Sequence, residues 1–229
     1  MKILAVDTAA NLCAAAIYDA DEARVLAAVS ENIGKGHAEV LMGYIERALD
    51  EAGTSFAEIG RIAVNVGPGS FTGVRIGVSA ARGFALALGC PAIGVTAFEA
   101  LAVEARDANP GKPVLVAIDA HRGEIYAQLF GADGKPAGEP LAGQPDDVLA
   151  LLSQASQGLV ITGSAAPIIN ETLGQKPFPV VSQAATGSIE TIARIAAGRA
   201  PGEAPKPLYL RGADAKPQTG FALPRKSAS

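Results

Sequence analysis

The sequence has no tryptophan, and only two cysteines and two histidines occur among its 229 residues. Cys13 and Cys90 lie among apolar residues, which is typical of small buried thiols in a reducing compartment, and no cysteine pair has metal-ligand spacing. His37 and His121 occur in no H-E-x-x-H frame, and no G-x-S-x-G motif is present. We expect His37 to be a polar cap or surface residue at the start of a helix, and His121 to be solvated in a turn. These absences argue against a peptidase built on a metal ion or a serine nucleophile.

Long apolar runs are also missing, since none approaches the roughly 20 residues that a membrane helix needs. Asp7 comes too early for the apolar segment of a signal peptide, so we expect a cytoplasmic protein without membrane contact. The net charge of −4 makes the chain a poor nucleic-acid binder on its own, because such affinity comes largely from Lys and Arg. Residues 211–229 differ, with four basic residues and one acidic residue. This segment is either an electrostatic handle or an unstructured end, and we favour the second.

Short apolar runs broken by glycine and proline predict an α/β chain. Residues 3–7, 13–18 and 24–31 form a predicted antiparallel meander, and a helix over 36–52 follows. Ser70 is a suitable N-cap for a helix that ends at Leu88, and Thr96 with Glu99 has capping-box spacing for a third helix. Further strands are predicted at 61–66, 91–95, 114–119, 124–130, 159–162 and 178–181, and further helices at 145–154, 165–172 and 188–198.

The opening pattern returns in the second half of the chain. Ala5-Val6-Asp7 matches Ala117-Ile118-Asp119, and Ile17-Tyr18 matches Leu129-Phe130, both at an offset of 112 residues without a gap. An apolar run that ends in Asp also arises by chance, but equal spacing within both hairpins favours two copies of one unit. We therefore predict two related α/β subdomains, residues 1–108 and 109–229.

Each copy ends its first strand with a carboxylate beside a turn. Asp7 with Thr8 fits one site for Mg²⁺ and nucleotide phosphate oxygens, and Asp119 fits another, because amides in such turns can point outward. Alternatively, both carboxylates only accept hydrogen bonds from turn amides. The two interpretations stay open for Asp7, and the second is favoured for Asp119.

A glycine-rich block over residues 67–77 joins a strand to the helix that ends at Leu88. The block has neither the lysine nor the spacing of a Walker loop, and it is not a G-x-G-x-x-G loop. Small residues at three- and four-residue spacing instead give the helix a smooth face that another helix could approach closely. We expect this helix and the one over 36–52 to pack against a copy of the chain or a related subunit. The alternative is that both helices only cover their own sheet. The predicted interface residues are His37, Val40, Leu41, Tyr44, Ser70, Phe71, Gly73, Val74, Gly77, Ala80, Ala81 and Phe84.

In order and spacing, residues 3–8, 67–77, 117–120, 122–126 and 207–211 resemble the TsaB (YeaZ) family, and the resemblance covers essentially the whole chain. It implies an actin-like ATPase (ASKHA, RNase H-like) fold of two subdomains. It also implies a non-catalytic scaffold subunit that is required with TsaD and TsaE. TsaD transfers a threonylcarbamoyl group to the adenosine 3′ of the anticodon in ANN-reading tRNAs, which forms threonylcarbamoyladenosine (t6A).

The resemblance further implies how such a subunit assembles. It predicts a heterodimer with TsaD through the helices over 36–52 and 70–88, a homodimer as the option when the chain is alone, and contact with tRNA only through the complex. TsaD relatives carry a metal-binding histidine pair, whose positions here are occupied by Ala97 and Leu101. The chain therefore looks like TsaB and not like TsaD. We expect no bound metal and no certain cofactor, with room for ATP or ADP where partner subunits meet.

A stand-alone small ATPase or kinase of the same fold is the main alternative. This function needs Asp7 and a second carboxylate in the cleft, for which the sequence offers Asp119. It also needs an adenosine-binding Gly-Gly pair, for which residues 162–164 are a poor substitute. ATP turnover by the isolated chain discriminates between this alternative and the scaffold.

Overall fold

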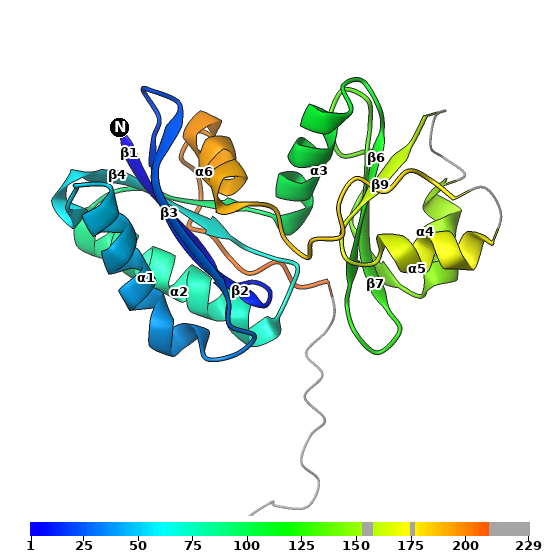
Figure 1. Ribbon diagram of the computed structural model, residues 1–229, viewed down its shortest axis with the longest axis horizontal. Helices are drawn as coiled ribbons and strands as arrows, with labels where there is room; N and C mark the ends of the chain where they lie inside the picture. Colours follow the sequence, from blue (N-terminus) through cyan, green and yellow to red (C-terminus); the bar gives the residue numbers. More distant parts are fainter. Residues whose placement is uncertain (153–157, 175–176, 211–229) are drawn as a thin grey trace, which may run out of the picture.

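The protein, described here as a computed structural model, contains two β-sheets with helices between and outside them (Figure 1). The structure describes residues 1–152, 158–174 and 177–210. The first sheet has the strand order β3-β2-β1-β4-β5, and the second has the order β8-β7-β6-β9. The strands are β1 (Lys2–Asp7), β2 (Leu12–Asp19), β3 (Arg24–Asn32), β4 (Ile59–Asn65), β5 (Ala92–Val95), β6 (Val114–Asp119), β7 (Ile125–Phe130), β8 (Leu141–Gly143) and β9 (Val160–Thr162). The helices are α1 (His37–Glu51), the short η1 (Phe56–Glu58), α2 (Phe71–Leu88), α3 (Ala97–Ala108), α4 (Pro145–Leu152), α5 (Ala166–Leu173) and α6 (Ile189–Gly198).

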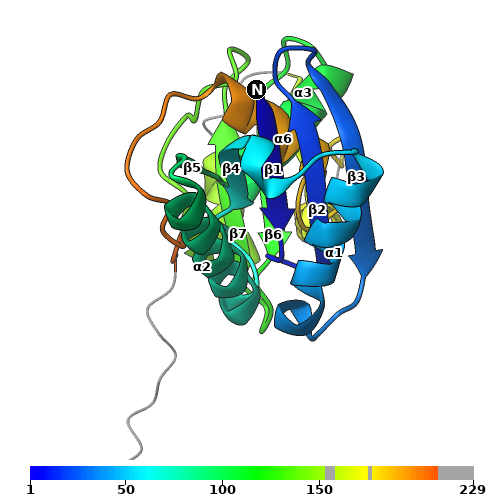
Figure 2. The same cartoon turned by 90° about the vertical axis from the view of Figure 1, so that its left-hand side faces the viewer.

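β1 lies at the centre of the first sheet because it is apolar on both faces. Every residue after Lys2 in this strand is buried. β1 pairs antiparallel with β2 and parallel with β4. Such nearly continuous apolar strands are typical of sheets that are covered on both faces. Here α1 and α2 lie side by side over one face (Figure 2), and α6 packs against the other.

Local capping signals fix where the helices begin and end. The hydroxyl of Ser70 accepts a hydrogen bond from the Gly73 amide at 3.2 Å, and Gly89 ends α2 in the left-handed conformation with a φ of 64°. The predicted capping box of Thr96 and Glu99 forms at the start of α3. The predicted helices over 36–52 and 70–88 are thereby confirmed as α1 and α2.

The two halves of the chain exchange one helix. α3 follows the last strand of the first sheet, yet Phe98 and Leu101 pack into the core of the second sheet. α6 comes late in the chain, yet Ile192 and Ala196 pack against the first sheet. Both helices therefore lie between the sheets (Figure 1). The division at residues 1–108 and 109–229 stays a prediction, and it separates each of these helices from the sheet that it covers.

The order of elements confirms two related α/β subdomains of the actin-like ATPase fold. In both, a central strand pairs antiparallel with the next strand and parallel with a later one, and two helices cover the outer face. The ungapped offset of 112 residues, however, is wrong within the second hairpin. Ile17 pairs with Leu4, but Leu129 pairs with Leu115, where an ungapped match would pair it with Val116. The second hairpin connection is one residue shorter, and a shift of one residue in a strand exchanges its two faces.

Other differences lie in the second half. Residues 178–181 do not form a strand, although Val180 makes an isolated bridge to Ile161. The helix predicted over 145–154 is described as far as Leu152, and its last residues lie outside the described part of the chain. The basic segment 211–229 also lies outside it, so both interpretations of that segment stay untested.

α2 is long and apolar enough to cross a membrane by length and composition alone. The core helices of soluble proteins pass the same test, and the inner side of α2 packs on the first sheet with Val74 and Val78. Only 28% of α2 is buried, so much of this apolar helix faces solvent. The other side of α2 is therefore a candidate contact surface.

Candidate functional site

A cavity of about 760 Å³ lies between the two halves of the molecule. The turn after β1 and the starts of α1 and α2 line one side, and the turn after β6 lines the other. Its lining includes the polar side chains of Asn11, Lys35, Ser70, Asp119 and Ser164. The predicted phosphate and Mg²⁺ ligands Asp7, Thr8 and Asp119 come from the ends of β1 and β6, at the two turns that border this cavity.

Asp7 does not line this cavity, because its carboxylate is used inside the protein. The side chain is 2% exposed. One carboxylate oxygen accepts a hydrogen bond from the Ala9 amide at 2.8 Å, and the other accepts one from Asn65 Nδ2 at 3.0 Å. Burial raises the pKa of Asp7, and these two hydrogen bonds oppose the rise. Asp7 therefore holds the turn after β1 to the end of β4.

Thr8 is buried in the same way. Its hydroxyl donates a hydrogen bond to the Gly73 carbonyl at 2.7 Å, which ties β1 to the first turn of α2. Asp7 and Thr8 thus fasten the chain to itself and leave no atom on the cavity wall. The geometry supports the turn-amide interpretation of Asp7, and the binding of phosphate or Mg²⁺ by Asp7 and Thr8 stays a prediction.

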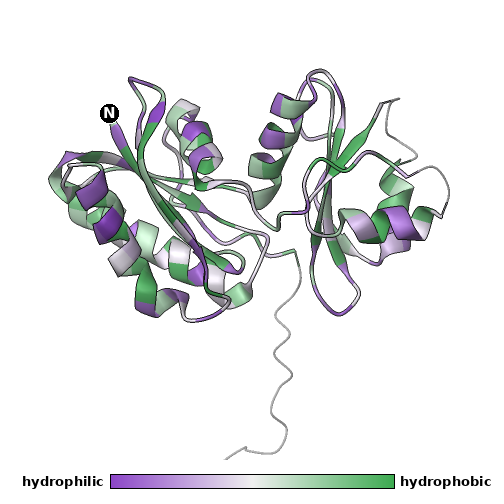
Figure 3. Ribbon diagram, viewed as in Figure 1, coloured by the Kyte–Doolittle hydropathy of each residue, from purple (hydrophilic) through white to green (hydrophobic). Residues whose placement is uncertain are grey.

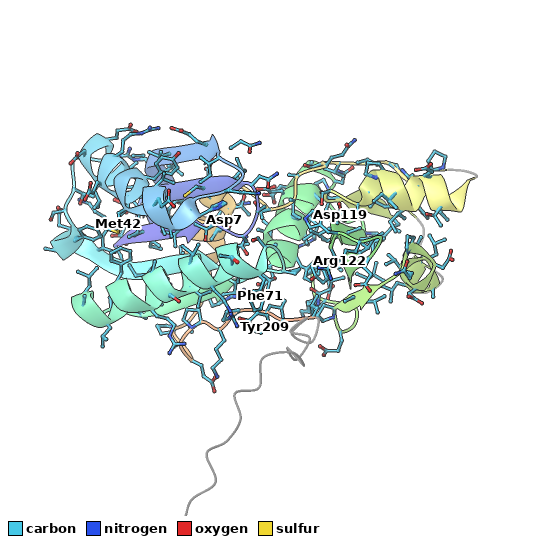
Figure 4. The ribbon with its side chains drawn as sticks, turned by 90° about the horizontal axis from the view of Figure 1, so that it is seen from below. Asp7, Met42, Phe71, Asp119, Arg122 and Tyr209 are labelled. Atoms are coloured by element: carbon cyan, nitrogen blue, oxygen red, sulfur yellow. The ribbon has the colours of Figure 1, made fainter. Side chains whose placement is uncertain are left out.

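Asp119 is the one predicted ligand that lies on the cavity wall. Its carboxylate accepts a hydrogen bond from the His121 amide at 2.8 Å, and its own amide donates to the Ser164 hydroxyl at 2.9 Å. His121 is largely exposed in this turn, as predicted, and its Nδ1 lies 3.6 Å from the second Asp119 oxygen. Figure 4 shows Asp7 and Asp119 in different halves of the molecule. The described residues therefore do not assemble the predicted pair of facing carboxylates.

The smooth face of α2 is also covered by the chain itself. A side chain at Gly73 would place its Cβ 2.0 Å from the Thr8 carbonyl oxygen, and a Cβ at Gly77 would lie 2.7 Å from the Thr8 hydroxyl. Ala81 is fully buried on the same side. Gly73, Gly77 and Ala81 thus face their own sheet, and their contact with a partner stays a prediction. Their small size instead allows α2 to lie close to the end of β1.

The other predicted interface residues divide by exposure. His37 is buried, and its Nε2 lies 3.2 Å from the Leu12 carbonyl oxygen. Of the two roles predicted for it, polar cap or surface residue, the surface role is therefore wrong. Leu41 and Val74 belong to the core under the helices. Ser70 and Phe71 are exposed, and the half-buried residues are Val40, Tyr44, Ala80 and Phe84.

The solvent side of α1 and α2 carries residues that the sequence argument missed. Met42 is 44% exposed, and Leu86 is 85% exposed. Gly43 and Gly83 meet open space where a Cβ would be. We call Met42, Gly43, Gly83 and Leu86 the outer face. The available signal was Leu86, an apolar residue on the solvent side that α2 shares with Arg75 and Arg82; Figure 3 shows the hydropathy of the helix.

Comparisons with known proteins agree with this architecture. Residues 25–165 match the family described as "TsaD: tRNA N6-adenosine threonylcarbamoyltransferase". A crystal structure of an uncharacterized protein with similarity to peptidase YEAZ from Pseudomonas aeruginosa superposes with a TM-score of 0.76 at 27% identity, over 92% of this chain and 99% of that chain. YeaZ from Pseudomonas aeruginosa superposes with a TM-score of 0.71 at 27% identity, over 85% of this chain and 91% of that one.

The tRNA threonylcarbamoyladenosine biosynthesis protein TsaB of Escherichia coli K12 is 39% identical over 126 residues. The chain belongs to the TsaB (YeaZ) family. The match to the Escherichia coli protein covers 55% of this chain and 53% of that protein, so the chain spans about half the length of this TsaB relative.

Two positions on α3 bear on the predicted difference from TsaD. Ala97 and Leu101, where the resemblance places the metal-binding histidines of TsaD, are both fully buried on α3 and pack against the second sheet. No group of three His, Cys, Asp or Glu side chains that could hold a metal ion occurs among residues 1–152, 158–174 and 177–210. At these two positions α3 serves packing.

Proposed function

We propose that this chain is a non-catalytic scaffold subunit in t6A formation on tRNA. It acts in the cytoplasm with a TsaD subunit, which transfers the threonylcarbamoyl group, and with TsaE. One observation carries the proposal: a chain of the TsaB family has the buried apolar residues Ala97 and Leu101 where the resemblance places the TsaD histidines. Neither side chain can coordinate a metal ion.

TsaD docks on the outer face of α1 and α2 in this proposal. Met42 of α1 and Leu86 of α2 supply exposed apolar area there. Gly43 and Gly83 let a partner helix come close to the backbone, since a Cβ at either position meets nothing within 4 Å. A second copy of the chain can use the same face when TsaD is absent.

ATP or ADP belongs, in this proposal, to the places where partner subunits meet and not to Asp7 and Thr8. Both of these side chains are buried and hydrogen-bonded within the chain. Only Asp119 among the predicted ligands reaches the cavity.

Reconstitution tests the proposal directly. Unmodified tRNA is incubated with TsaD, TsaE and an enzyme that supplies threonylcarbamoyl-adenylate, with or without this chain, and t6A is measured by nucleoside mass spectrometry. We expect t6A only when the chain and TsaD are both present, and no ATP turnover by the chain alone. Formation of t6A without TsaD would overturn the scaffold.

An Asp119→Asn variant separates the scaffold from the alternative ATPase or kinase. The substitution keeps the size of the side chain and removes the negative charge on the cavity wall. The scaffold proposal predicts a t6A yield within about twofold of wild type. ATP turnover by the isolated wild-type chain that is lost in Asp119→Asn would favour the stand-alone enzyme instead.

A further inference from the structure

A second cavity, of about 440 Å³, lies between α2 and the segment that follows α6. Arg75, Val78, Ser79 and Arg82 line it from α2, and Pro207 and Tyr209 line it from the segment. No Asp or Glu is among these residues. The cavity therefore combines two guanidinium groups and two hydroxyl groups in a protein whose overall net charge is −4.

Arg75 holds two aromatic rings together at this cavity. Its guanidinium carbon lies 3.8 Å from the centre of the Phe71 ring and 5.6 Å from that of Tyr209, and its Nε donates a hydrogen bond to the Tyr209 hydroxyl at 2.7 Å. The two rings lie next to each other, with centres 5.6 Å apart (Figure 4). Phe71 is nevertheless 50% exposed and Tyr209 is 48% exposed. Stacking surface thus remains available on both rings.

The backbone that carries Tyr209 is fixed on both sides. The Leu208 amide donates a hydrogen bond to the Val66 carbonyl at 2.8 Å. Leu208 and Leu210 both pack against the core that α3 forms with the second sheet. Alternate residues of this segment therefore bind opposite halves of the molecule, because neighbouring side chains in an extended chain point to opposite sides. The backbone on either side of Tyr209 is therefore held by contacts with both halves of the molecule.

Arg82 supplies a charge that nothing in the described part of the chain neutralises. It lies two turns after Arg75 on α2, about 10 Å further along the helix axis. Its side chain is exposed, and neither arginine forms an ion pair with a carboxylate among the described residues. A partner that places a negative charge beside exposed rings fits this arrangement.

We infer that this cavity, together with the Phe71 ring beside Tyr209, is a contact site for an unpaired stretch of RNA, with a base on Phe71 or Tyr209 and a phosphate on Arg82. Proteins bind single-stranded RNA by stacking bases on aromatic and arginine side chains while basic residues neutralise the backbone. The inference rests on the proposed function in one respect, namely that the RNA is the tRNA substrate held by the complex. Contact between this subunit and tRNA would then be direct.

The decisive test measures tRNA affinity of the complex assembled with TsaD and TsaE, by fluorescence anisotropy at several salt concentrations. Arg82→Glu is expected to weaken binding at least tenfold and to reduce the slope of log K against log salt by about 0.7, the value for one phosphate contact on a single strand. Phe71→Ala is expected to weaken binding at least about fivefold through lost stacking. Lys112→Glu, the same charge change at an exposed turn of the other half, is the matched control and should leave affinity unchanged.

A photocrosslink between a 4-thiouridine single-stranded oligonucleotide and the full chain alone gives a reading that does not need TsaD. We expect the crosslinked peptides to contain Phe71 or Tyr209. If Arg82→Glu binds tRNA as wild type does, or if the crosslinks lie elsewhere, the RNA site is wrong. Loss of TsaD binding in Phe71→Ala, at the far end of α2 from Gly83 and Leu86, would also overturn it, because the cavity would then be a protein interface. If instead the wild-type chain does not bind TsaD but the crosslinks still map to these rings, the scaffold proposal is contradicted and the RNA site is supported.

Discussion

The hydroxyl of Thr8 donates a hydrogen bond to the carbonyl oxygen of Gly73 at a distance of 2.7 Å. This bond joins the end of β1 to the first turn of α2, and it lies where a side chain at Gly73 or Gly77 would collide with Thr8. The glycines of the block over 67–77 thus serve close packing within the chain. The surface that remains for a partner is the opposite side of α2.

Glycine substitutions on the two sides of α2 should have opposite effects on stability. Gly73→Ala places a methyl group 2.0 Å from the Thr8 carbonyl oxygen, and overpacking of this kind costs about 1–3 kcal/mol. Gly83→Ala meets open space, and alanine in a helix stabilises it by up to about 1 kcal/mol relative to glycine. Urea unfolding of both variants measures the difference. Equal unfolding free energies for the two would contradict the close contact between Thr8 and α2.

The end of α6 should depend on Arg61. Its buried Nη1 donates hydrogen bonds to the carbonyl oxygens of Ala196, Ala197 and Arg199 at 2.6, 3.0 and 3.0 Å. A positive charge also stabilises a helix at this end. We expect Arg61→Met to lower the free energy of unfolding by about 2–3 kcal/mol, since three carbonyls lose a charged donor.

Hydrogen exchange provides the specific reading for this variant. Amides of α6 should exchange faster in Arg61→Met, whereas amides of α5, which packs on the other sheet, should be unchanged. Uniform acceleration across both helices would mean that Arg61 acts on global stability and not on the cap of α6.

The pH dependence of stability should reveal the buried carboxylate of Asp7. Burial raises its folded-state pKa above the ordinary value of 3.8, so the folded state holds the proton more tightly than the unfolded state does. The stability that comes from the protonated form is fully present below about pH 4 and is lost as pH rises through the folded-state pKa. Asp7→Asn removes this titrating group. The side-chain amide of the new Asn then lies beside the side-chain amide of Asn65.

The unfolding free energies of wild type and Asp7→Asn, measured between pH 4 and pH 8, check this sign. We expect the variant to be more destabilised relative to wild type at pH 4 than at pH 8, because the wild type loses stability as Asp7 ionises. A destabilisation that grows as pH rises would show that the folded-state pKa is lowered.

Local signals allowed the elements of the fold to be predicted. Ser70, Gly89 and the pair Thr96 and Glu99 act within one turn of helix, so their effect is readable from neighbouring residues. The exchange of α3 and α6 between the halves could not be predicted in this way. The apolar side of α3 or α6 could pack on either sheet. Which sheet each helix covers depends on contacts between residues that are distant in sequence.

The site was harder to predict because burial decides it. A carboxylate at the end of a strand suits an ion or a turn amide equally well. One oxygen of Asp7 accepts from the nearby Ala9 amide, but the other accepts from Asn65, which is 58 residues away and cannot be found by local reasoning. Likewise, small residues suit close packing against a partner or against the chain's own strand. Gly73 and Gly83 are ten residues apart, which places them about 80° apart around the helix, and only the three-dimensional structure shows which faces inward.

The affinity of TsaD for glycine variants on the outer face tests the central claim most directly. Gly43→Arg and Gly83→Arg project a long side chain into open space, so the isolated chain should unfold within a few degrees of wild type. Gly198→Arg, at the end of α6, also meets open space and is the matched control. We predict that the two outer-face variants lose at least about 100-fold in TsaD affinity, which corresponds to about 2.7 kcal/mol, and that Gly198→Arg binds as wild type does. Binding of TsaD to both outer-face variants within twofold of Gly198→Arg would contradict the docking surface proposed here.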